Sequence, residues 1–173
     1  NRGPDRAETS LLGDFQAENS ALAIITARFL LHRYLPPYKK PSMDTYIRKG
    51  IENTRLSGRM ELVRSTPPVI LDGAHTPVSV ERLMKAVQQL YKEPLILLFG
   101  SVTGKDITSM VRILSPYCKT VIVSTPGWFK KSDPELIYKV FRQHHCDVHF
   151  LPDPKEAFDF AETAAGDSMP IVV

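Results

Sequence analysis

The feature that most constrains the fold is an alternation of short apolar runs with helical segments, which extends from about Ser57 to the end of the chain. The apolar runs are rich in β-branched residues, whereas the segments between them repeat apolar residues at helical spacing. Near-continuous apolar strands between helices indicate a parallel sheet covered on both faces. Right-handed crossovers then predict a doubly wound, mostly parallel α/β sheet. Strands are predicted at residues 69–71, 95–99, 120–124, 148–151 and 171–173, and helices at residues 77–91, 107–114, 134–144 and 154–165.

Local signals support these boundaries. Proline occupies the first position of three predicted helices, directly behind Thr76, Asp133 or Asp153. A proline loses no hydrogen bond at that position, and the residue before it can cap the helix. Residues 60–63 are predicted to add an antiparallel strand at the edge of the sheet.

The first part of the chain has a helical pattern instead. Apolar residues recur at helical spacing over residues 16–35, and the pair Pro36-Pro37 ends this predicted helix because proline lacks the N–H donor. A second, shorter helix is predicted over residues 43–48, with Ser42 as its cap and Gly50 as its stop.

Composition excludes several classes of protein. With 43% apolar and 24% charged residues, the chain is typical of a globular domain rather than of a disordered or fibrous one. A formal net charge of +3 does not argue for nucleic acid, and the longest apolar run, residues 94–99, is too short to span a membrane. Cys118 and Cys146 form no CxxC pair and indicate reduced thiols. We therefore expect a cytoplasmic protein that binds neither nucleic acid nor membrane.

One strand end carries most of the reactive side chains. In open α/β sheets, ligands gather at the carboxyl ends of the strands. The strand at residues 69–71 leads there into Asp72, the small residues Gly73 and Ala74, and then His75 at a helix start. The slim turn lets a ligand approach the backbone, Asp72 offers acceptors, and His75 can donate, accept or stack. The alternative is that Asp72 and Thr76 only cap the helix and His75 is a solvated loop residue.

Residues 98–106 look like a phosphate-binding loop between a strand and a helix but depart from its pattern. Three residues rather than four separate Gly100 from Gly104, and Lys105 is followed by Asp106 instead of Ser or Thr. A carboxylate at that position would repel phosphate, so a P-loop is rejected. The GxGxxG dinucleotide pattern is absent from the chain.

Two further groups of polar residues are candidate sites. His144, His145, Cys146 and His149 match no zinc spacing, so a fortuitous cluster is favoured over a metal site. Lys130-Lys131 follows a predicted strand, where it can meet an anion or simply lie in a solvated loop.

Two segments together resemble the Mur ligase superfamily and, within it, the folylpolyglutamate synthases with their bifunctional dihydrofolate synthase relatives. The run Gly58-Arg59-Met60-Glu61 resembles the GR-x-E segment of this family, and Asp72 to Pro77 resembles its DGAHNP motif, with Thr76 in place of asparagine. Gly100 and the pair Lys105-Asp106 match a glycine and a lysine–aspartate pair that follow the next strand in the family.

A third similarity lies upstream. Gly13 to Asn19 resembles the glycine–His–Gln–x–x–Asn helix near the end of the central domain of the family, with Phe15 in place of histidine. The resemblance implies that residues 1–54 are the tail of a central ATPase domain with a linker, and that residues 55–173 are a Rossmann-like ligase domain truncated at its end. The amino-terminal P-loop and magnesium ligands of the family are not in this sequence.

The resemblance also implies an activity. Enzymes of this family are ATP-dependent ligases that form an acyl phosphate with ATP and Mg²⁺, which the incoming amine then attacks. The chain is expected to be a fragment of such a ligase, inactive alone, that adds L-glutamate to the glutamate tail of folate. Its expected partners are ATP, folate, L-glutamate and the missing P-loop domain, in a monomer.

Site residues follow from the same resemblance. Asn19, Arg59 and Asp72 are expected to contact ATP, whereas His75 and Lys105 are expected to contact substrate; no metal ligand is expected in this chain. Arg59 in a surface salt bridge with Glu61 is the structural alternative. Another Mur-type amino-acid ligase, a non-catalytic nucleotide-binding α/β module and a purely structural domain also stay open as functions.

Overall fold

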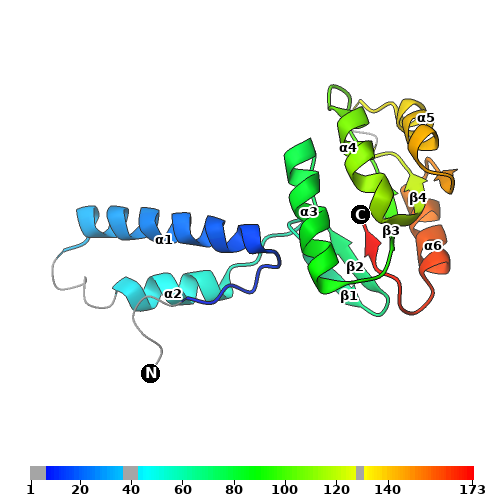
Figure 1. The fold of residues 1–173 in the computed structure, drawn as a ribbon. Helices are drawn as coiled ribbons and strands as arrows, with labels where there is room; N and C mark the ends of the chain where they lie inside the picture. Colours follow the sequence, from blue (N-terminus) through cyan, green and yellow to red (C-terminus); the bar gives the residue numbers. More distant parts are fainter. Residues whose placement is uncertain (1–6, 37–42, 128–130) are drawn as a thin grey trace. The chain divides into compact units, whose positions relative to one another are not determined.

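The computed structural model describes residues 7–36, 43–127 and 131–173 and is drawn as a ribbon in Figure 1. The chain forms two compact units, Asn1–Arg59 and Met60–Val173. The predicted cap Ser42 and the predicted anion contact Lys130 lie outside the described residues. Within the described part, no helix combines the length and the apolarity needed to cross a membrane.

The first unit contains two helices that contact each other, α1 (Asp14–Tyr34) and α2 (Met43–Asn53). Arg28 of α1 donates from Nε to Oδ1 of Asp44 in α2 at 2.9 Å. The prediction that Gly50 stops the second helix was wrong, because α2 continues to Asn53. The side chains of Asn53 and Thr54 donate to the carbonyls of Lys49 and Gly50, so these groups near the helix end keep partners.

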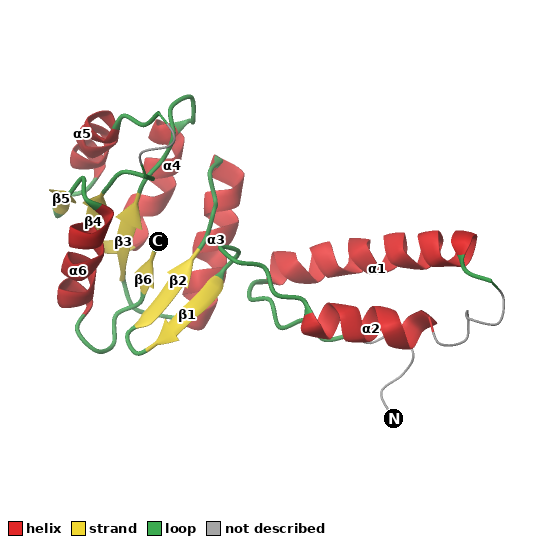
Figure 2. Cartoon of the chain, turned by 180° about the vertical axis from the view of Figure 1, so that it is seen from behind, coloured by secondary structure: helices red, strands yellow, loops and turns green. Residues whose placement is uncertain are grey.

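The second unit is built on a six-stranded sheet with the order β1-β2-β6-β3-β4-β5, which Figure 2 shows in yellow. β1 pairs with β2 in antiparallel orientation, and the other pairs are parallel. The predicted mostly parallel sheet with an antiparallel edge strand is confirmed. Its strands are β1 (Glu61–Ser65), β2 (Pro68–Leu71), β3 (Leu95–Phe99), β4 (Cys118–Val123), β5 (Val148–Phe150) and β6 (Ile171–Val172).

Helices cover both faces of this sheet. On one face α3 (Pro77–Leu90), α4 (Ile107–Leu114) and α5 (Pro134–His144) contact one another in sequence, and on the other face lies α6 (Pro154–Ala165). Side chains of β3 point alternately to the two faces of the sheet and so contact both helix layers. Phe99 packs edge-on against Phe141 of α5, whereas Ile96 and Leu98 belong to the cluster under α6. Small alanines line the buried side of α6 and let it pack closely against the strands: Ala157, Ala161 and Ala165.

The three helices with an early proline begin where the sequence predicts. Their caps accept hydrogen bonds from backbone N–H groups of the first turn, from Ser79 to Thr76, from Leu136 to Asp133, and from Lys155 and Glu156 to Asp153.

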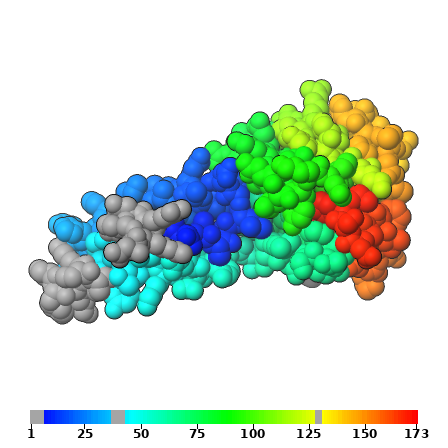
Figure 3. All heavy atoms as spheres, turned by 60° about the horizontal axis from the view of Figure 1, so that its bottom comes forward, coloured from blue at the N-terminus to red at the C-terminus, as the bar shows by residue number. Residues whose placement is uncertain are grey.

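The last strand lies inside the sheet rather than at its edge. β6 pairs with β2 on one side and β3 on the other, and Ile96 donates from its backbone N to Pro170 O at 2.9 Å just before β6. In Figure 3, the red surface of the segment that leads into β6 lies beside the green surface of the segment between α3 and β3. The amino-terminal ends of these two strands are therefore joined by backbone contact.

We expect Gly100→Ala to lower the free energy of unfolding by about 1–2 kcal/mol, measured by chemical denaturation. Gly100 follows β3, and a Cβ atom there would lie 3.1 Å from Ser124 O and 3.3 Å from Pro126 N. Both are backbone atoms of the next loop, which must shift to make room.

Gly50→Ala is the matched control. A Cβ at Gly50 meets nothing within 4 Å, and this glycine lies inside α2, where alanine is the better helix former by up to about 1 kcal/mol. A Gly100→Ala protein as stable as the parent would show that the two loops do not constrain each other.

Candidate functional site

The turn that follows β2 is fixed by one carboxylate. Asp72 accepts from the backbone N of Ala74 through Oδ1 at 2.7 Å and from the backbone N of Met60 through Oδ2 at 2.8 Å. Its own N–H donates to Val173 O in the neighbouring strand segment at 2.9 Å. Of the two residues that the alternative made helix caps, Thr76 is the cap of α3 and Asp72 is not.

His75 lies on the same turn with its side chain exposed. Its Nδ1 is 2.9 Å from the carbonyl oxygen of Gly73. Because a carbonyl only accepts, this bond favours the tautomer with the proton on Nδ1 and leaves Nε2 as an acceptor at the surface. The turn thus orients the ring, which stays exposed.

The start of α3 completes this turn. Thr76 Oγ1 accepts from Ser79 N at 3.2 Å, and Ser79 Oγ in return accepts from the backbone N of Thr76 at 3.0 Å and of His75 at 3.1 Å. This reciprocal capping box gives partners to the backbone N–H groups of Thr76 and Ser79, and Ser79 also holds the backbone of His75 at the helix start. Ser79 is a residue of the turn that sequence reasoning missed, although the T-x-x-S spacing is its local signal.

Lys105 lies at the same edge of the sheet, in the loop between β3 and α4. In the sheet, β6 lies between β2 and β3. Lys105 follows β3 and is therefore two strands away from the Asp72 turn, which follows β2. Two hydrogen bonds hold this loop against the loop between β4 and α5. Thr103 N donates to Lys131 O at 3.0 Å, and Ser132 Oγ donates to Ser101 O at 2.6 Å.

Asp106 is committed to the start of α4. It accepts from Ser109 N at 3.1 Å, and hydrogen bonding by Ser109 lowers the pKa of its carboxyl below the usual range. This negatively charged cap occupies the place where a P-loop needs a hydroxyl, which agrees with the rejection of that motif.

The remaining two predicted residues belong to the first unit. Asn19 lies in the second turn of α1, where its Nδ2 donates to Oε1 of the buried Gln16 at 3.0 Å. Arg59 is exposed and is the last residue of that unit, directly before Met60. The structure therefore brings Asp72 and His75 into one turn, places Lys105 on the same sheet edge, and holds Asn19 and Arg59 in the other unit.

Two histidines near β5 make hydrogen bonds within the protein, His145 to backbone atoms and His149 to a carboxylate. His145 donates from Nε2 to Cys118 O at 2.9 Å and accepts from Asp147 N through Nδ1 at 3.1 Å, which uses both ring nitrogens. His149 Nε2 lies 2.9 Å from Asp147 Oδ1. Among the described residues, no three His, Cys, Asp or Glu side chains are placed to hold a metal ion together.

Asp147 also joins β4 to the start of β5. Thr120 donates from Oγ1 to Asp147 Oδ2 at 2.6 Å, and this bond, followed by that of His149, lowers the pKa of the Asp147 carboxyl. The two residues are 27 positions apart, so no local pattern could have predicted the pair.

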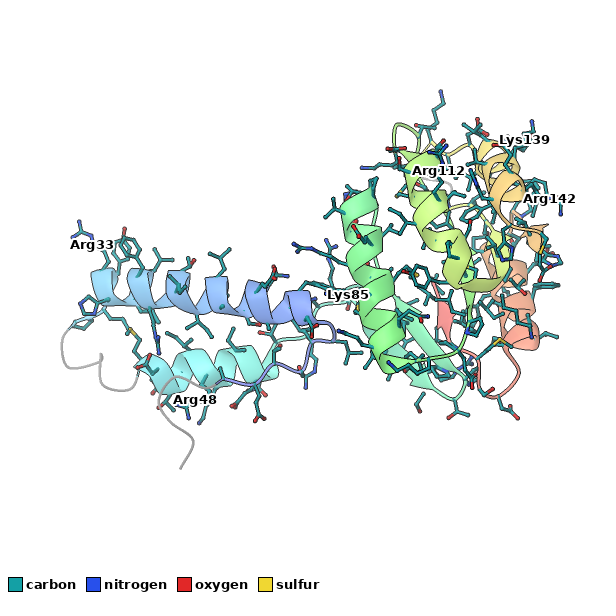
Figure 4. The ribbon with its side chains drawn as sticks, in the orientation of Figure 1. Arg33, Arg48, Lys85, Arg112, Lys139 and Arg142 are labelled. Carbon is teal, nitrogen blue, oxygen red and sulfur yellow. The ribbon has the colours of Figure 1, made fainter. Side chains whose placement is uncertain are left out.

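Basic side chains lie elsewhere on the second unit. Figure 4 shows Lys85 on α3, Arg112 on α4, and Lys139 and Arg142 on α5, all on the helices that cover one face of the sheet. These side chains come from the helix layer, whereas the Asp72 turn and Lys105 come from the loops at the carboxyl edge.

A mostly parallel sheet covered on both faces, with a slim polar turn at its carboxyl edge, defines a Rossmann-like α/β domain. Residues 58–173 match the family model described as "Mur ligase, glutamate ligase domain". The chain therefore belongs to the Mur ligase family, and the resemblance carried by Arg59 and the Asp72 turn is confirmed.

Similar proteins bear folylpolyglutamate synthase names. The enzyme of Lacticaseibacillus casei is 30% identical over 137 residues, which is 79% of this chain and 31% of that protein. The Thermotoga maritima folylpolyglutamate synthase structure matches with a TM-score of 0.71 at 26% identity and covers 95% of this chain and 37% of its own. The Mycobacterium tuberculosis enzyme, complexed with ADP and AMPPCP, has a TM-score of 0.79 at 23% identity, over 95% of this chain and 38% of its own. The chain thus spans between 31% and 38% of the length of these relatives.

We expect one fast-reacting thiol in the folded chain. Cys146 is exposed, whereas Cys118 is buried and burial raises its pKa to about 12. Because the thiolate is the nucleophile, a disulfide reagent at pH 8 should modify Cys146 at least about a hundredfold faster than Cys118. Stopped-flow absorbance measures both rates.

Matched serine variants identify the two phases. Cys146→Ser should remove the fast phase, and Cys118→Ser should leave it intact. A fast phase that survives in Cys146→Ser would contradict the burial of Cys118.

Proposed function

We propose that the chain is part of an ATP-dependent ligase that adds L-glutamate to the glutamate tail of folate through an acyl-phosphate intermediate. The observation that carries the proposal is the Asp72–His75 turn at the carboxyl edge of a sheet that belongs to the Mur ligase glutamate ligase domain. Relatives named folylpolyglutamate synthase support the substrate class. Two free cysteines, Cys118 and Cys146, fit a reducing compartment such as the cytoplasm.

We also propose that residues 1–54 are the tail of the central ATPase domain of that enzyme. α1 exposes large apolar side chains at helical spacing, Leu22, Ile25 and Phe29, each more than 60% exposed. A stripe of large apolar side chains along a helix is normally covered by the rest of a larger core. The relatives are long enough to supply such a core, since this chain covers only 31% of the Lacticaseibacillus casei enzyme.

The proposed nucleotide contacts come from three side chains of this chain. The guanidinium of Arg59 suits a phosphate, because it can donate two parallel hydrogen bonds. The amide of Asn19 can both donate to and accept from an adenine edge. Asp72 would accept from ribose hydroxyls or orient one of the donors. ATP would supply the phosphoryl group that activates the acceptor carboxylate.

Magnesium ligands are proposed to lie outside this chain. The described residues contain no group of three His, Cys, Asp or Glu placed to hold a metal. A divalent cation at the phosphates would then be held by the part of the enzyme that carries the P-loop.

His75 and Lys105 are the proposed substrate contacts. The ammonium of Lys105 can bind a glutamate carboxylate, and Nε2 of His75 can accept from the incoming amine or, when protonated, donate to a carboxylate. Both residues follow carboxyl ends of parallel strands, where ligands of such sheets bind.

The chain by itself should release no phosphate from ATP in the presence of Mg²⁺, folate and glutamate. The physical reason is that its described residues provide neither a P-loop nor a metal-binding group. A colorimetric phosphate assay, with the complete ligase as positive control, measures this. Phosphate release by the purified chain above the blank would contradict the proposal that the P-loop and the magnesium ligands lie outside this chain.

Arg59→Ala in the complete enzyme should reduce kcat/KM for ATP by about a hundredfold or more with little change in melting temperature. Loss of a charge-assisted phosphate contact removes several kcal/mol of transition-state stabilisation, whereas an exposed salt bridge is worth about 1 kcal/mol or less. Arg112→Ala, at an exposed arginine of α4, is the control.

Rate measurements on the complete enzyme also distinguish the class of acceptor substrate. Glutamate transfer to folate supports the proposal, whereas transfer only to a peptidoglycan precursor would identify another Mur-type amino-acid ligase. A rate loss below about fivefold in Arg59→Ala would show that Arg59 has only a structural role.

A further inference from the structure

The carboxylate of Asp72 joins its own turn to a stretch of backbone that lies twelve residues earlier in the chain. Its Oδ2 accepts from Met60 N at 2.8 Å, and its Oδ1 accepts from Ala74 N at 2.7 Å. Each of these amides belongs to the neighbour of a proposed ligand-binding residue, because Arg59 precedes Met60 and His75 follows Ala74.

Met60 has an unusual conformation for its residue type. Its φ of 49° is in the left-handed region, which residues other than glycine rarely adopt, and the residue is only 1% exposed. Burial anchors the residue from one side, and the hydrogen bond from its N–H to Asp72 anchors it from the other. These two contacts therefore hold Met60, directly after Arg59, in a backbone conformation that a methionine rarely adopts.

We propose that Asp72 is a positioning residue whose carboxylate clamps the Met60 and Ala74 amides, and so fixes how the backbone presents Arg59 and His75. The clamp itself follows from the geometry of the turn. Its consequence for turnover rests on the proposed function, in which Arg59 binds phosphate and His75 binds substrate.

A second aspartate at the same sheet edge provides the contrast. Asp153, the cap of α6, also accepts two backbone amides, but both bonds, from Lys155 at 2.8 Å and Glu156 at 3.0 Å, end on the same oxygen, Oδ1. An asparagine side chain has one acceptor oxygen and one NH₂ donor. It can therefore replace Asp153 without losing either bond, but at position 72 it can accept only one of the two amides.

Amide hydrogen exchange in the 173-residue chain tests the clamp without any ligand. In Asp72→Asn, the exchange rate of the Met60 or the Ala74 amide should rise at least about tenfold, because a backbone group loses a charge-assisted bond. The Ile122 amide in the buried β4 should stay unchanged. In the control Asp153→Asn, the Lys155 and Glu156 amides should keep their rates.

Unchanged exchange at both Met60 and Ala74 in a folded Asp72→Asn chain would overturn the clamp. A measurement on the unaltered chain covers the case in which that variant does not fold. Protonation of a single carboxylate perturbs every amide bonded to it, so the Met60 and Ala74 amide resonances should shift with one common midpoint as the pH is lowered. Two different midpoints would overturn the proposal.

A double-mutant cycle in the complete enzyme tests whether Asp72 acts through Arg59. If it does, Asp72→Asn combined with Arg59→Ala should be within about twofold of Arg59→Ala alone in kcat/KM for ATP. Rate losses that multiply would show that Asp72 affects turnover other than through Arg59 and would contradict its positioning role toward that residue. If Arg59→Ala has no effect on the rate, the nucleotide assignment of Arg59 fails, and amide exchange alone decides the clamp.

Discussion

Burial of the central strands from both faces is the constraint on which the second unit depends. All five residues of β3 are buried, with Ile96 and Leu98 under α6 and Phe99 against Phe141 of α5. A parallel sheet made of such strands is stable only when helices cover both of its faces. Every parallel strand must then leave the sheet at the same edge, and the polar connections gather there.

That edge is stabilised mainly by contacts to backbone groups. The Asp72 carboxylate accepts two amides, the loop after β3 approaches the backbone of the next loop at Gly100, and Ser124 donates to Pro152 O at 3.1 Å. Hydrogen bonds to backbone fix the path of the chain rather than a particular side-chain rotamer. The same contacts that stabilise the edge therefore also set the direction in which His75 is presented.

Sequence reasoning succeeded where the signal was local. Thr76, Asp133 and Asp153 each stand directly before a proline, and each caps the predicted helix through bonds to residues two or three positions ahead. It failed where a local rule competed with another contact. Gly50 does not stop α2, which continues to Asn53, and the side chain of Thr54 donates to the Gly50 carbonyl.

The sequence by itself determined the order of strands and helices along the chain, the slim turn from Asp72 to His75, and the family. Each of these depends on residues close together in the chain. Tertiary structure alone decided that β6 lies between β2 and β3, that Thr120 meets Asp147, and that Asp72 holds the amide of Met60. These arrangements depend on which strands become neighbours when the sheet and its covering helices pack together. A contact between residues twelve or more positions apart leaves no periodic pattern in the sequence, so only the packed fold reveals it.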